Sequence, residues 1–201
     1  MSETKIPPQI SVSNWNVPNA LTMTRIALAL AMFGFLECEY YIIGLILFLI
    51  ASVTDWLDGW WARKYRQVTV FGRIMDPFAD KLVVCGAFIY LASLPELAKI
   101  LYGLRLIVVV IVARELFITT LRAFLEQQGR DFSAKMAGKL KMGLQCTAIS
   151  ACLLWVILPH DTKSLTPQPF ALYWIMAISV WGTLFLTLYS GVGYVVAALK
   201  K

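Results

Sequence analysis

Charged residues are scarce in this chain. Asp, Glu, Lys and Arg make up 15% of its 201 residues, hydrophobic residues make up 59%, and the mean hydropathy is +0.70. A soluble globular domain carries about 25% charged residues. This shortage of charge excludes an ordinary soluble domain, and it predicts a protein that lies within a lipid bilayer.

The sequence also lacks the patterns of several common sites and of multidomain chains. Its four cysteines show no CxxC spacing, and three lie in apolar runs, where a thiol packs as a small hydrophobe. The single histidine, His160, lies in an expected loop far from the acidic residues below, so we assign it no catalytic role. Without repeats or long linkers, we expect one domain over 1–201, with 1–19 as a cytoplasmic or interfacial segment that includes a possible short interfacial helix.

Acidic residues are outnumbered, with 12 Asp plus Glu against 18 Lys plus Arg and a net charge of +6. Many of the basic residues lie within or beside apolar segments. Anionic lipid headgroups and phosphate-bearing substrates are therefore the expected partners, and we expect no nucleic acid.

Six apolar stretches are each long enough to cross about 30 Å of hydrocarbon as a helix. We therefore predict an all-α, polytopic membrane protein with six transmembrane helices. The expected spans are Ala20–Leu36, Tyr40–Ala62, Pro77–Leu94, Ile100–Leu125, Leu140–Leu158 and Phe170–Leu199.

The connections between these stretches alternate in charge. Those at 64–73 and 127–139 are basic, as are both ends of the chain, whereas the other connections carry few Lys or Arg residues. Because cytoplasmic loops are enriched in Lys and Arg, we expect both termini and these two loops in the cytoplasm. Short loops and the absence of a transit segment favour a bacterial inner membrane.

Four aspartates lie where the expected second and third spans approach the cytoplasm. Asp55 and Asp58 share a helix face at i and i+3, and Asp76 and Asp80 do so at i and i+4. Asp55 follows Tyr40 by about 22 Å of helix, which leaves it inside the hydrocarbon layer. Because the connection is short, we expect the two spans to be antiparallel neighbours whose carboxylates converge.

Four carboxylates cannot all stay ionised in a low-dielectric pocket unless cations neutralise them. Carboxylate oxygens suit hard divalent ions, so the cluster predicts a site for two Mg²⁺ or Mn²⁺ ions. The alternative is that each aspartate forms a structural ion pair with Arg63, Arg73 or Lys81, which would not explain why the aspartates cluster.

The spacing of these residues resembles a known signature. Asp55-x-x-Asp58-Gly59-x-x-Ala62-Arg63, followed by Gly72, Asp76 and Asp80, is similar to the motif of the CDP-alcohol phosphotransferase family. The resemblance implies a six-helix membrane homodimer that transfers a phosphatidyl group from CDP-diacylglycerol to an alcohol. It also implies metal ligands at Asp55, Asp58, Asp76 and Asp80, with Asp80 as the base. The CDP-binding set that it implies is Thr22, Asp58, Gly59, Ala62, Arg63 and Gly72.

Flanking motifs point to one branch of this family. The segments 16–25, 75–81, 113–122 and 133–141 resemble phosphatidylglycerophosphate synthases, and cardiolipin synthases share much of this pattern. An acceptor with its own phosphate, such as glycerol 3-phosphate, needs a cationic pocket beside the carboxylates. The residues predicted to form this pocket are Arg114, Arg122, Lys135, Lys139 and Lys141.

Other interpretations stay open at this stage. Basic residues near the cytoplasm also anchor membrane proteins, and Arg114 could form a structural ion pair with Glu115 of a neighbouring helix or with Asp80. Within the enzyme class, a cardiolipin synthase that uses phosphatidylglycerol is the second candidate, ahead of inositol phosphate or serine transfer. A cation transporter is a candidate of another class, because carboxylates inside a membrane also mark ion pathways. The positive charge of Arg63, beside the acidic residues, disfavours a path for cations.

Overall fold

The computed structural model describes residues 17–65, 70–127, 136–158 and 170–199. Within these ranges, the side chains of residues 17–18, 56–65, 70–71, 73, 126–127, 136–139, 194 and 197–199 are not described. The described residues form seven helices, as expected for an all-α protein. They are α1 (Val17–Glu37), α2 (Tyr41–Tyr65), α3 (Val70–Ser93), α4 (Pro95–Ile100), α5 (Leu104–Gln127), α6 (Met136–Ile157) and α7 (Phe170–Leu199).

Six of these helices correspond to the six expected apolar stretches, and the largest difference in a boundary is at the start of α3. Helix α3 begins at Val70, seven residues before the expected start, so Pro77 lies inside the helix. Neighbouring helices can compensate for the hydrogen bond that a proline removes, which makes proline tolerable within membrane helices. Asp76, the first acidic residue of α3, therefore lies within the helix, and the helix fixes the direction of its side chain.

Helix α4 was not expected, because it lies in the connection between the predicted spans Pro77–Leu94 and Ile100–Leu125. Pro95 occupies the first turn, where its missing N–H costs nothing, and Glu96 complements the positive end of the helix dipole. Lys99 lies in the last turn, where a positive charge is also favourable. These local signals identify α4 in retrospect. Its length of six residues was too short for an apolar pattern to reveal it.

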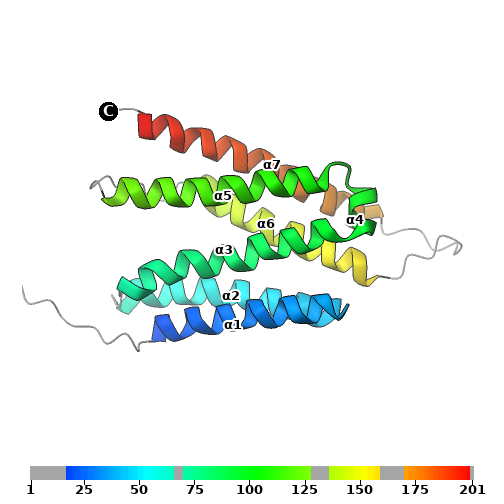
Figure 1. The fold of residues 1–201 in the computed structure, drawn as a ribbon, viewed down its shortest axis with the longest axis horizontal. Coiled ribbons are helices and arrows are strands. Elements are labelled where there is room, and N and C mark those ends of the chain that lie inside the picture. Colours follow the sequence, from blue (N-terminus) through cyan, green and yellow to red (C-terminus); the bar gives the residue numbers. More distant parts are fainter. Residues whose placement is uncertain (1–16, 66–69, 128–135, 159–169, 200–201) are drawn as a thin grey trace, which may run out of the picture.

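The long helices run back and forth along a common direction (Figure 1). The N-terminal ends of α1 and α3 and the C-terminal ends of α2, α5 and α7 lie at one end of the bundle, opposite α4 (Figure 1). Helix α1 packs along both α2 and α3, whereas α2 and α3 contact each other only over a short stretch. The second and third spans are thus linked mainly through α1, and direct contact between them is less than we expected.

The second half of the chain packs on the other side of α3. Helix α5 lies against α3 and α7, and α6 lies against α7, α2 and α3. Helix α3 is therefore central, with contacts to α1, α2, α4, α5 and α6. Residues of α3 can reach groups in both halves of the molecule.

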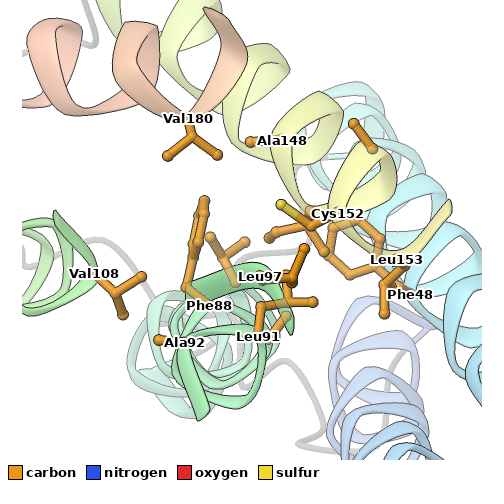
Figure 2. Packing of buried hydrophobic residues seen from close by; sticks show 14 of the residues in the cluster. Phe48, Phe88, Leu91, Ala92, Leu97, Val108, Ala148, Cys152, Leu153 and Val180 are labelled. Carbon is orange, nitrogen blue, oxygen red and sulfur yellow. The ribbon is translucent and has the colours of Figure 1, made fainter. Parts of the chain in front are cut away.

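One apolar cluster joins the helices toward the α4 end of the bundle. Phe88 of α3 extends toward Ala148 of α6 and Val180 of α7, while Phe48 of α2 lies near Leu153 of α6 (Figure 2). Aliphatic and aromatic side chains from all seven helices contribute to this cluster. Its burial fixes the relative positions of α2, α3 and α6, and these helices carry the charged groups described below.

Three helices in the described part of the chain are long and apolar enough to cross a membrane. They contain the segments Asn19–Glu37, Leu140–Ile157 and Phe170–Gly193, and Tyr41–Asp55 is a shorter apolar segment. Large hydrophobic side chains remain exposed on the outer faces of the bundle, for example Phe185 and Leu106. Such faces suit contact with lipid, and the described helices are those of an integral membrane protein.

Candidate active site

Two polar residues of α1 contact the aspartates of α2 and α3. The Thr22 hydroxyl donates a hydrogen bond to Oδ1 of Asp76, and Arg25 forms an ion pair with Asp55 at 2.8 Å between Nη1 and Oδ1. Thr22 and Arg25 are three residues apart, so they lie on the same face of α1. Asp55 and Asp76, from two different helices, therefore come together beside one turn of α1.

The burial of these groups indicates that the site opens at one side. Thr22 and Arg25 are buried, with 0% and 1% of their surface exposed. The Asp55 side chain, by contrast, is 26% exposed and Asp76 is an exposed residue. The α1 residues thus form the inner wall, and the carboxylates point toward accessible space.

Asp80 follows Asp76 by one turn of α3 and is held by its neighbour in sequence. Nζ of Lys81 donates a hydrogen bond to Oδ2 of Asp80 at 3.0 Å. The side chain of Asp80 is 28% exposed. Asp76 and Asp80 lie on the same face of α3, since they are four residues apart. The predicted base is therefore both accessible and oriented by a cation.

A buried carboxylate on α5 gathers three cations. Glu115 is 2% exposed, and its Oε2 contacts Nζ of Lys81 at 2.8 Å. Its Oε1 accepts hydrogen bonds from Nζ of Lys141 on α6 and from Nη1 of Arg114, the latter at 3.1 Å. We call these four residues, Glu115, Lys81, Arg114 and Lys141, the Glu115 cluster. Because Lys81 also contacts Asp80, the cluster is continuous with the aspartates of α3.

Arg114 is fixed from a second direction by α7. Its Nη2 donates a hydrogen bond to Oγ of Ser190 at 2.6 Å. A Cβ atom at Gly191 would lie 3.4 Å from Nε of Arg114, so the small residue lets α7 approach this guanidinium closely. Arg114 is 11% exposed, and it connects α5 to α7 at the depth of Glu115.

The structure tests some of the predicted ion pairs. Arg114 pairs with Glu115, but within α5 and not across two helices as expected, and Lys81 does pair with Asp80. Such pairs are compatible with a binding role, since each cation here is held by a carboxylate rather than buried alone.

Arg122, another residue of the predicted acceptor pocket, is half-buried and lies two turns beyond Arg114 on α5.

Several predicted site residues fall wholly or partly outside the described part of the structure. Lys135 precedes α6, and Lys139 lies in the first turn of α6 with its side chain not described. The side chains of four predicted site residues near the end of α2, and of one alternative ion-pair partner on α3, are also not described. They are Asp58, Gly59, Ala62 and Arg63 on α2 and Arg73 on α3. Gly72 of the predicted CDP-binding set is buried near the start of α3.

The predicted metal site consists of the same aspartates together with Asp58. Among the side chains that the structure describes, no group of three or more His, Cys, Asp or Glu residues is arranged to hold a metal ion. One of the four predicted ligands, Asp58, lies outside that set. The accessible oxygens of Asp55, Asp76 and Asp80 are donors of the type that Mg²⁺ and Mn²⁺ prefer.

Sequence reasoning gave no role to three residues that the structure brings into the site. Arg25 was only part of a flanking motif, Lys81 was named only as an alternative partner, and Ser190 was not considered. A charge inside an apolar helix demands a partner, which is the signal that could have identified Arg25 and Lys81. Ser190 gives no such signal, because serine is common in membrane helices.

Comparison with known proteins accounts for this arrangement. Residues 15–189 match the family of CDP-alcohol phosphatidyltransferases. The chain belongs to this family. The family predicted from the acidic signature is thus confirmed, and the CDP-alcohol phosphatidyltransferase match covers every helix described here except the end of α7.

Individual relatives are similar over most of their length. A CDP-diacylglycerol--glycerol-3-phosphate 3-phosphatidyltransferase of Bacillus subtilis (strain 168) is 39% identical over 90% of this chain and 93% of the relative. A protein of the same name from Rickettsia bellii (strain RML369-C) is 34% identical to this chain, over 92% of this chain and 96% of the relative. In Arabidopsis thaliana, protein 2 of that name is 31% identical, over 87% of this chain and 79% of the relative.

Membership of the CDP-alcohol phosphatidyltransferase family decides the class of function. The chain is a membrane enzyme that transfers phosphatidyl groups, and the cation transporter considered from the sequence is not supported. The aspartates of α2 and α3 and the Glu115 cluster are the charged groups available for this chemistry.

Proposed function

We propose that this protein transfers a phosphatidyl group from CDP-diacylglycerol to sn-glycerol 3-phosphate, giving phosphatidylglycerophosphate and CMP. One observation carries the proposal: accessible aspartates on α2 and α3 adjoin a cluster that contains Arg114 and Lys141. Carboxylates suit a metal-bound pyrophosphate, and buried cations suit a phosphate on the acceptor. The names of the relatives agree with both substrates.

Asp55, Asp58, Asp76 and Asp80 are the residues that would hold two Mg²⁺ or Mn²⁺ ions. When bound, these ions supply positive charge that stabilises the pyrophosphate and the departing CMP. Thr22 and Arg25 orient the carboxylates of Asp76 and Asp55 toward this role. The matching hard-oxygen donor set supports the assignment.

Asp80 serves as the general base. It takes the proton from the acceptor hydroxyl as that oxygen attacks the phosphorus of the phosphatidyl group in line. A new P–O bond forms to the acceptor, and the P–O bond to CMP breaks. Lys81 holds Oδ2 of Asp80 at 3.0 Å, so the orientation of the base does not depend on substrate.

The CDP moiety occupies the region near the end of α2 and the start of α3. Gly59, Ala62 and Gly72 are small enough for a nucleotide and its pyrophosphate to approach the helices closely. Arg63 belongs to the same set by the family motif, whereas Thr22 is fully buried and acts on the site through its hydrogen bond to Asp76. The CDP-binding role of these residues is an assignment from the family motif, and buried Gly72 is compatible with it.

The acceptor phosphate binds to the basic residues of α5 and α6. Arg114 and Lys141 converge on Glu115, and Arg122 lies toward the end of α5. Lys139 lies in the first turn of α6, and Lys135 precedes this helix in the sequence. A phosphate monoester carries a charge of about −1.5 to −2 at neutral pH, which such a pocket would compensate.

The six long helices span the membrane, with both termini and the active site on the cytoplasmic side of a bacterial inner membrane. Helices α2, α3 and α5 bring charged residues into the bilayer, and pairing among those residues lowers the cost. The basic loops support the cytoplasmic placement of the termini and the active site. The resemblance to the family implies that the working unit is a homodimer.

The proposal is tested by supplying purified protein and CDP-diacylglycerol with one acceptor at a time. Glycerol 3-phosphate, phosphatidylglycerol, inositol phosphate and serine are compared, and CMP release is measured with Mg²⁺ or Mn²⁺ present. We expect CMP release with glycerol 3-phosphate, and its loss with EDTA. Release with phosphatidylglycerol instead would identify a cardiolipin synthase and contradict the proposal.

A further inference from the structure

We propose that Glu115 is a positioning residue for the transfer reaction. Its buried carboxylate holds the cations of the acceptor pocket in one arrangement and, through Lys81, orients the base Asp80. This inference rests on the proposed function, because it assigns a purpose to the geometry of that same site. Glu115 itself does not touch the substrate.

The contacts of Glu115 exclude a direct chemical role. The residue is 2% exposed, and both of its carboxylate oxygens accept bonds from cations. A carboxylate with both oxygens occupied in this way is poorly placed to receive a proton from a substrate or to bind a metal ion. Its effect on the reaction must pass through the groups that it contacts.

Those groups come from different helices. Lys81 belongs to α3 and Lys141 belongs to α6. Arg114 lies next to Glu115 on α5. On its other side, Arg114 donates a hydrogen bond to Ser190 of α7. Helices α3, α5 and α6 thus meet at one carboxylate, and α7 joins through Arg114. In Figure 1, α5 and α6 lie between α3 and α7, and both of them contact α3 and α7.

Lys81 transmits the position of Glu115 to the base. Its Nζ lies 2.8 Å from Oε2 of Glu115 and 3.0 Å from Oδ2 of Asp80. The ammonium is therefore shared by a buried and an accessible carboxylate. Without Glu115, Lys81 would be free to follow Asp80 toward solvent, and the orientation of Asp80 would be less defined.

Charge alone and positioning lead to opposite expectations, which makes the inference testable. Lys81, Arg114 and Lys141 carry three positive charges, and Asp80 and Glu115 carry two negative charges, so the set has one net positive charge. Replacing Glu115 by glutamine raises this to two. If Glu115 only moderated the charge, Glu115→Gln would tighten the binding of glycerol 3-phosphate. If it positions the cations, binding weakens although the pocket is more positive.

The test measures CMP release by the full chain in detergent, with glycerol 3-phosphate and CDP-diacylglycerol varied in turn. For Glu115→Gln we expect the KM for glycerol 3-phosphate to rise by about tenfold or more and kcat to fall, with the KM for CDP-diacylglycerol within about twofold of wild type. Glu115→Asp keeps the charge but shortens the reach, so we expect a smaller rise in the same KM. The matched control is Glu96→Gln, which removes an exposed carboxylate on α4 at the opposite end of the bundle.

The outcomes separate the inference from the function on which it rests. An unchanged or lower KM for glycerol 3-phosphate in Glu115→Gln overturns the inference while leaving the proposed function intact. If Glu115→Gln is not monodisperse, Glu115→Asp decides, and wild-type kinetics in that variant overturn the inference. Wild-type protein that releases no CMP with glycerol 3-phosphate overturns the proposed function and the acceptor pocket together.

Discussion

Three cations inside the bundle, Arg25, Lys81 and Lys141, each have at least one acidic partner in the described part of the site. Arg25 pairs with Asp55, Lys81 with Asp80 and Glu115, and Lys141 with Glu115. An unpaired charge at such depth costs on the order of 3 kcal/mol or more. Pairing therefore lets the protein keep reactive groups within an apolar bundle without losing its stability.

Asp80→Asn should remove the proposed base without changing the shape of the site. We expect kcat to fall by roughly 10²–10⁴-fold, because an amide cannot accept the hydroxyl proton. Binding of CDP-diacylglycerol should stay within a few-fold of wild type, measured by equilibrium binding with divalent metal present. Turnover close to wild type in this variant would show that another group is the base.

Arg25→Ala should destabilise the fold by breaking the pair between α1 and α2. Removing one partner of a buried ion pair costs about 3–5 kcal/mol. Because the Asp55 side chain is 26% exposed and can be partly hydrated, we expect the lower end of this range, near about 3 kcal/mol. Thermal unfolding in detergent measures the effect as a lower Tm. Lys99→Ala, at an exposed position in α4, is the control, and an equal effect in both variants would exclude a special role for the pair.

At the scale of elements, α1 is the helix that joins the two acidic helices. It packs along α2 and α3, and its polar face contacts Asp55 and Asp76. The α1–α2 hairpin is tight: a Cβ atom at Gly44 would lie 2.3 Å from Cδ2 and 2.8 Å from Cγ of fully buried Leu36. The absence of a side chain at Gly44 thus sets the separation of the two helices.

Gly44→Ala should loosen this hairpin. Overpacking in a well-packed region costs about 1–3 kcal/mol, so we expect a clear loss of thermal stability and, through displacement of α2, reduced activity. The matched control is Gly34→Ala on α1, where a Cβ atom would meet nothing within 4 Å. That variant should be neutral or more stable by about 0.4–1 kcal/mol, because alanine favours the helix. Equal stability of the two variants would contradict the close approach at Gly44.

At the scale of the whole molecule, the ends of the long helices form two groups at opposite ends of the bundle. The ends of α2, α5 and α7 lie at the same end of the bundle as the starts of α1 and α3, whereas the α1–α2 connection and α4 lie at the other end (Figure 1). If the active site faces the cytoplasm, the α1–α2 connection must face outward.

Cys38 provides a test of this orientation. It is an exposed free thiol in the α1–α2 connection, whereas Cys85 and Cys152 are buried. We expect a membrane-impermeant maleimide to label Cys38 in right-side-out bacterial membrane vesicles but not in inverted ones. Cys38→Ser is the control for reaction at the other cysteines. Labelling only in inverted vesicles would reverse the proposed topology.

Several features of this protein follow from its amino-acid sequence alone. The scarcity of charge predicts the membrane location, and the lengths of the apolar runs predict the six long helices, because both depend on local composition. The acidic signature from Asp55 to Asp80 predicts the family, since its spacing is defined along the chain. These features need no knowledge of which helices become neighbours.

The partners of the charged residues were decided only by the tertiary structure. No local pattern indicates that Glu115 meets Lys81 from 34 positions earlier and Lys141 from 26 positions later, or that Arg114 meets Ser190. Charges in an apolar environment must find counter-charges, but the packing of side chains between helices determines which ones are within reach. That is why the family could be predicted from the acidic signature in the sequence, whereas the contacts of Glu115 required the fold.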